Sequence, residues 1–203
     1  DAASLAGLTP VVRPGLRVLT GMSRAERWPE LGRSELEEVW RAARALASWT
    51  VVDCGFGVEQ DEVLSYDTRA PQRNAATLCA LAAADVVVVV GAADPIGLQR
   101  LVRAVLDLGD LGLSAACVVA VSKVRASAAG PRPAEAIRQA LGRYAGVDQV
   151  HLLPWDPAAC DAAVLGGRLL SEVGAGGPLV RALTDLADRV RGAVPSRHVP
   201  AAH

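Results

Sequence analysis

Short apolar runs alternate with longer amphipathic segments along most of the chain. Continuous or alternating apolar residues predict short strands at 16–19, 51–53, 86–90, 118–121 and 150–153. Apolar residues at helical spacing predict helices at 34–46, 75–83, 95–108, 134–144 and 178–190. This alternation is typical of an α/β fold with a mostly parallel sheet. The five valines at 86–90 are typical of a strand that is buried on both faces.

The 203 residues suffice for one domain with a substantial core. Because 51% of the residues are hydrophobic but only 3% are aromatic, that core must consist of Ala, Val and Leu. We expect a single domain over residues 1–191 and a disordered tail over 192–203, which is polar and interrupted by proline. The chain begins at Asp1 without a methionine, which suggests that a preceding segment has been removed.

Charge and cysteine content narrow the function classes. The net charge of −1 provides no overall attraction to nucleic acid or acidic membranes. The four cysteines are far apart and have no neighbouring histidine, which argues against zinc or iron–sulfur ligation and favours a reducing cytoplasm. No secretory signal is present, and the longest apolar run, interrupted by Asp85, is too short to span a bilayer.

Four predicted strands end in residues that could bind a ligand. Ligands of parallel sheets bind at the carboxyl ends of the strands, which here are 53–57, 91–95, 122–123 and 154–156. Asp, Gly, Pro and Ser are also ordinary turn residues, so each stretch alone has a purely structural explanation. A Rossmann fingerprint at 55–60 is disfavoured, because Gln60 stands where the third glycine belongs.

The order of these stretches resembles that of the MinD/ParA family of deviant-Walker ATPases, in its ParA-like or pilus-localising branch. The matching segments are DCGFGVE, AAADVVVVVGAADPIGLQRLVRAVLDL, VVAVSKV, LLPWDPAACDAAVLGGRLL and PLVRALTDLADRV. The resemblance implies a three-layer α/β/α, P-loop NTPase-like fold. It also implies an ATP-dependent switch that positions or partitions a chromosome, plasmid, septum, or secretion or pilus machinery.

The resemblance assigns roles to particular residues. Asp53 would be the Walker B-type aspartate that holds Mg²⁺ through water, and the backbone N–H of Gly57 would meet the γ-phosphate. A second group would surround the base: Ser122, Lys123, Pro154, Trp155 and Asp156. Before a predicted helix, Arg69, Arg73 and Asn74 would contact a nucleotide across a homodimer, a partner protein or DNA; the alternative is a solvated loop.

Several departures from the family qualify this prediction. The sequence contains no glycine-rich loop with lysine, so we expect ATP and Mg²⁺ in a longer parent protein but not on this chain alone. Ser122 stands where the family has an adenine-contacting Asn, and a serine hydroxyl cannot replace both groups of the amide. The C-terminus has no amphipathic membrane anchor.

Two classes of function therefore remain open: the ATP-driven switch, and a non-catalytic interaction scaffold that has lost nucleotide hydrolysis. Nonspecific DNA binding is a further possibility for arginines in the C-terminal half, although interleaved acidic residues favour a solvated face instead. These arginines are Arg138, Arg143, Arg168, Arg181, Arg189 and Arg191.

Overall fold

A computed structural model describes residues 1–194 except for residues 23, 56 and 60–73. The chain divides into two compact units, residues 1–84 and residues 85–203, which are described separately below. The tail was expected to be disordered over residues 192–203. Helix α9 continues to Ala193, and residues 195–203 lie outside the described part of the chain.

The first unit contains helices and one short hairpin. Its elements are α1 (Ala2–Leu8), β1 (Val11–Arg13), β2 (Leu16–Arg17), η1 (Ala25–Glu30), α2 (Arg33–Leu46) and α3 (Ala75–Ala83). Helix α2 packs against both α1 and α3, and Leu36 and Ala43 are its buried residues. These two residues lie seven positions apart, so they share the apolar face that the sequence pattern predicts.

Two strands that the sequence predicts for the parallel sheet are absent from it. Residues 16–17 pair antiparallel with β1, and residues 51–53 form no strand, with Val51 94% exposed. Residues 16–17 pair with a different strand, whereas residues 51–53 pair with none in the described part of the chain. A β-branched run becomes a strand only where a neighbouring strand accepts its backbone hydrogen bonds.

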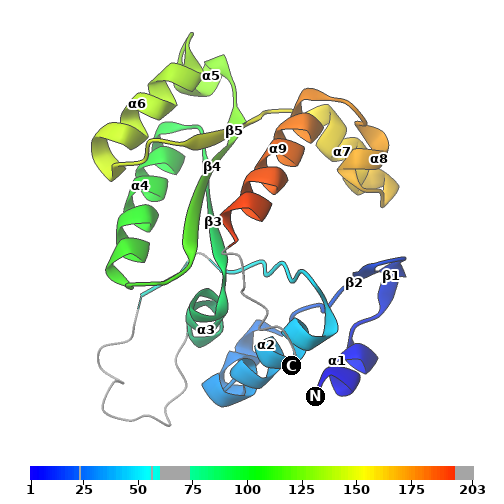
Figure 1. The fold of residues 1–203 in the computed structure, drawn as a ribbon. Coiled ribbons are helices and arrows are strands. Elements are labelled where there is room, and N and C mark those ends of the chain that lie inside the picture. Colours follow the sequence, from blue (N-terminus) through cyan, green and yellow to red (C-terminus); the bar gives the residue numbers. More distant parts are fainter. Residues whose placement is uncertain (23, 56, 60–73, 195–203) are drawn as a thin grey trace, which may run out of the picture. The chain divides into compact units, whose positions relative to one another are not determined.

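The second unit contains a parallel sheet with strand order β3-β4-β5 (Figure 1). Its elements are β3 (Val86–Ala92), α4 (Pro95–Asp110), β4 (Ala116–Val124), α5 (Ala126–Ala129), α6 (Pro133–Ala145), β5 (Val150–Pro154), α7 (Pro157–Gly166), α8 (Leu170–Val173) and α9 (Pro178–Ala193). The predicted α/β class with a parallel sheet is therefore confirmed. None of the described helices is both long and apolar enough to cross a membrane.

One face of this sheet forms the main core. Val89, Val119 and Val121 face Leu101 of α4 and Ile137 and Leu141 of α6, and all six are buried. Close packing explains one sequence feature of β3: a Cβ at Gly91 would lie 2.7 Å from Cβ of Leu101. Glycine at this position lets α4 approach the sheet closely.

The opposite face of β3 is less covered than the sequence suggests. Val88 and Val90 are 37% and 58% exposed, so the prediction of a strand buried on both faces was wrong. Strand β3 lies at the edge of the three-stranded sheet, and α9 packs mainly against β5 and β4 on this side (Figure 1). Apolar residues on a strand do not reveal how far the covering helix extends across the sheet.

Candidate functional site

The carboxyl ends of β4 and β5 place five of the predicted site residues at one edge of the sheet. Ser122 and Lys123 lie near the end of β4, Pro154 ends β5, and Trp155 and Asp156 follow directly. A backbone hydrogen bond from Trp155 N to the Val124 carbonyl, 3.1 Å long, connects the two strand ends. We call these five residues, together with Arg125, the rim.

Ser122 has a structural partner at the neighbouring strand. Its hydroxyl donates a hydrogen bond of 3.1 Å to the Gly91 carbonyl, and its own carbonyl accepts a bond of 3.0 Å from the Ala93 N–H. These bonds extend the β3–β4 ladder to the end of β3. Since the single hydroxyl proton is used here, Ser122 retains only acceptor capacity for a ligand.

Lys123 has an unusual backbone conformation. Its φ angle is 57°, and it is the only described residue other than glycine with positive φ. The β4–β5 register shifts between Val121 and Val124, so Lys123 lies at an irregularity of the ladder. A left-handed conformation of a residue with a Cβ is strained, and such strain clusters at functional sites.

Trp155 is flanked by two cations. The Lys123 ammonium group lies 5.5 Å from the centre of the indole ring, and the Arg125 guanidinium carbon lies 5.6 Å from it. Arg125 also donates a hydrogen bond of 3.0 Å from Nη1 to the Lys123 carbonyl. Trp155 is 42% exposed, Lys123 is exposed and Arg125 is half-buried, so a ligand can reach the ring and the lysine from solvent. Each cation is attracted to the aromatic ring by only about 0.5–1 kcal/mol at an exposed site.

Arg125 was missed by the sequence analysis. Its signal is its position just after the predicted strand end, where ligand-binding residues of parallel sheets lie.

The acidic residues near the rim cap helices. Asp156 accepts a hydrogen bond of 3.1 Å from the Ala159 N–H at the start of α7, and Asp94 accepts one of 2.9 Å from the Gly97 N–H at the start of α4. The Gly97 N–H lowers the pKa of Asp94, and the charge of Arg125 contributes in the same direction. Both carboxylates therefore have a local structural role as N-caps.

Asp53, Gly57 and Asn74 belong to the first unit. Asp53 is exposed and follows no strand, contrary to the prediction that it ends one, and it lies beside Cys54. Burial raises the pKa of the Cys54 thiol, and the negative Asp53 raises it further. A Cβ at Gly57 would lie 2.9 Å from Oδ1 of Asn74, and Asn74 donates a bond of 3.0 Å to the Glu59 carbonyl.

The hydrogen bond to Glu59 gives Asn74 a structural role. Arg69 and Arg73 lie outside the described residues. Among the residues that are described, no group of three or more His, Cys, Asp or Glu side chains is placed to hold a metal ion.

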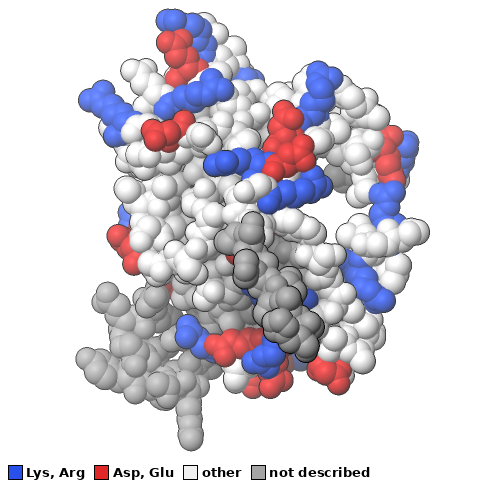
Figure 2. Space-filling model, viewed as in Figure 1, with Lys and Arg blue, Asp and Glu red and all other residues white. Residues whose placement is uncertain are grey.

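Three of the six arginines considered for DNA binding have local partners. Arg191 pairs with Asp188 at 2.5 Å, Arg168 donates a bond of 2.8 Å to the Glu172 carbonyl, and Arg181 donates to the Gly176 carbonyl. Figure 2 shows basic and acidic side chains interspersed over the visible face. Mixed charge of this kind is typical of a solvated surface.

No model of a known protein family matches the sequence. No curated protein is similar to it either. The resemblance to the MinD/ParA family therefore depends on the motifs alone, and it stays a prediction.

Proposed function

We propose that this chain is part of a MinD/ParA-like ATPase that acts as an ATP-dependent positioning or partitioning switch. We propose further that the rim binds the nucleotide base. The observation that carries the proposal is the combination of Lys123, Arg125 and Trp155 at the carboxyl edge of a parallel sheet. Ligand sites of open α/β sheets lie at this edge.

The arrangement of the second unit supports a three-layer α/β/α fold of the P-loop NTPase type. Helices α4 and α6 cover one face of the sheet, and α9 lies on the other (Figure 1). The strands are parallel and are connected through helices, as in doubly wound folds.

The rim chemistry suits a planar anionic ligand. The exposed part of the Trp155 ring provides a surface on which a base can stack, and the two cations attract the negative charge of a nucleotide. Base recognition by hydrogen bonds is reduced, since the Ser122 hydroxyl proton is directed to Gly91. We therefore expect weak discrimination between purine bases at this rim.

The sequence contains one lysine, Lys123, and no phosphate-binding loop. Phosphate and Mg²⁺ binding would need groups beyond the rim. Asp53 is the residue proposed to hold Mg²⁺ through water, and an exposed carboxylate is compatible with that role. Bound Mg²⁺ would neutralise phosphate charge during hydrolysis.

The alternative is a non-catalytic scaffold that uses the same fold for interactions. It is favoured by the engagement of Ser122, Asp94 and Asp156 in structural hydrogen bonds, which leaves few free polar groups at the rim. In this case the second unit would present its surfaces to a partner protein or to a second copy of the chain.

The test is magnesium-dependent ATP hydrolysis by the protein translated from the complete gene. We expect hydrolysis, with a KM for ATP that rises at least fivefold in Lys123→Ala and Trp155→Ala, while Arg138→Ala, an exposed arginine on α6, leaves KM unchanged. Absence of ATP binding and hydrolysis in the complete protein would exclude the switch and support the scaffold. Hydrolysis with an unaltered KM in both rim variants would place the base elsewhere.

A further inference from the structure

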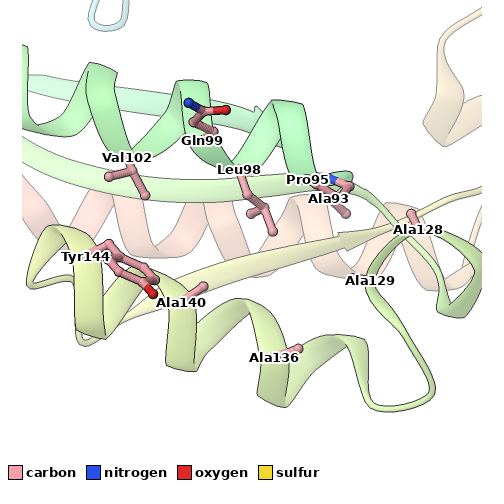
Figure 3. Close-up of a pocket in the computed structure, with 10 residues that line it drawn as sticks. All are labelled: Ala93, Pro95, Leu98, Gln99, Val102, Ala128, Ala129, Ala136, Ala140 and Tyr144. Carbon is pink, nitrogen blue, oxygen red and sulfur yellow. The ribbon is translucent and has the colours of Figure 1, made fainter.

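A groove lies between α4 and α6 within the second unit (Figure 3). Its volume is about 530 Å³, which is within the range of small-molecule sites. It begins near Ala93 and Pro95 and extends to Val102 and Tyr144.

Small residues create this groove. Ala136 and Ala140 of α6 lie opposite Leu98 and Val102 of α4, with Ala128 and Ala129 at one end. Alanine side chains are too short to fill the space between the two helices. A groove with apolar walls favours an apolar occupant, because burial removes apolar surface of both from water.

The groove is apolar along its length and has polar groups only at two lining residues. Gln99 and Tyr144 are the polar residues among the ten that line it. Figure 3 shows the Gln99 amide directed away from α6 and the Tyr144 ring beside Ala140. The walls therefore provide dispersion contacts and almost no hydrogen bonds, which suits an aliphatic chain.

A positive charge marks the Tyr144 end. The guanidinium carbon of Arg143 lies 5.3 Å from the centre of the Tyr144 ring. Arg143 is exposed, and within the described parts of the chain no ion pair joins it to a carboxylate. An anionic head group at this end would complement the charge, and a carboxylate matches the fork of the guanidinium.

We propose that the groove between α4 and α6 binds a medium-chain carboxylate, with its aliphatic chain between Leu98, Val102 and Ala140 and its head group at Arg143. From Pro95 to Val102 the helix rises about 10 Å. An extended chain advances roughly 1.25 Å per carbon, so about eight carbons fill this length. The proposal is independent of the function suggested for the rim.

Isothermal titration of the whole chain with decanoate, hexanoate and decanol tests this assignment. Decanoate should bind saturably and at least tenfold more tightly than hexanoate, because each methylene adds apolar contact. Decanol has the same chain length without the charge and should bind at least threefold more weakly than decanoate. Arg143→Gln should remove that difference, whereas Arg138→Gln on the same helix should preserve it.

Filling the groove is the second arm of the experiment. Ala140→Leu and Ala136→Leu each place a larger side chain in the groove and should weaken decanoate binding at least tenfold. The control is Ala162→Leu, the same exchange at an exposed position of α7. Ala136 is itself exposed, so its variant retains the fold if Ala140→Leu does not. No saturable decanoate binding, or equal binding by Ala136→Leu, would overturn the assignment.

Discussion

The Lys123 ammonium group lies 5.5 Å from the centre of the Trp155 ring, although the two residues are 32 positions apart in the sequence. The backbone of Lys123 is left-handed, with φ of 57°, at the irregular end of the β4–β5 ladder. The strained backbone of Lys123, the single lysine of the chain, thus directs its side chain toward the exposed ring of Trp155.

The strain at Lys123 can be measured by comparing two substitutions. Both Lys123→Ala and Lys123→Gly remove the cation near Trp155, but only glycine adopts positive φ without steric conflict. We expect Lys123→Gly to be about 1 kcal/mol more stable than Lys123→Ala, from the cost of the left-handed conformation. Urea denaturation of the two variants gives the difference. Equal stabilities would mean that the backbone relaxes in the alanine variant.

Two glycines of α4 should respond in opposite directions to the same substitution. A Cβ at Gly97 would lie 2.5 Å from the Ala92 carbonyl oxygen, whereas a Cβ at Gly109 meets nothing within 4 Å. Gly97→Ala should destabilise the chain by about 1–3 kcal/mol, because the helix must move away from the end of β3. Gly109→Ala should be neutral or stabilise by about 0.5 kcal/mol through higher helix propensity. Thermal and urea denaturation of both variants provide the test, and equal effects would contradict the close contact at Gly97.

Because of Asp94, the stability of the folded chain should fall as the pH becomes acidic. Its pKa is lowered from 3.8, chiefly by the hydrogen bond from the Gly97 N–H. A lowered pKa in the folded state contributes stability above the unfolded value, and this contribution is lost as the pH falls through the folded value. Asn keeps the N-cap but does not titrate. The Tm of the wild type should therefore fall more steeply than that of Asp94→Asn between pH 5 and the acid limit of folding, and parallel curves would contradict the role of the carboxylate.

Asp53→Asn should leave the fold intact. Asp53 is exposed and lies outside any helix or strand, so the change in the free energy of unfolding should stay within about 0.5 kcal/mol. Leu101→Ala, at a residue that is 2% exposed, is the contrasting variant and should cost about 2–5 kcal/mol. A large loss of stability in Asp53→Asn would make this aspartate structural and would weaken its proposed role at Mg²⁺.

Nucleotide binding to the present chain is a separate question. Without a glycine-rich lysine loop in the sequence, we expect no micromolar affinity for ATP with Mg²⁺. Isothermal titration of ATP and Mg²⁺ into this chain checks the expectation. Micromolar binding would show that the phosphates have a site other than the one the family resemblance implies.

The sequence by itself determined β3, α4, β4, α6 and β5, and the position of α9. Apolar periodicity, proline at the first turn of α4, α6 and α9, and the glycine at the end of α6 are local signals, and these elements begin and end near the predicted residues. Helix α7 carries similar signals, Asp156 and Pro157 at its start and Gly167 at its end, although no helix was predicted there.

Only the tertiary structure decided which apolar runs became strands and which polar residues met. Residues 51–53 have the composition of a strand but no pairing partner among the described residues, and Val90 belongs to a strand whose outer face α9 barely covers. Arg125 and Trp155 come together only because β4 and β5 are parallel neighbours. Backbone pairing and helix coverage depend on residues far away in the chain, so local patterns report what a segment can form and not what it contacts.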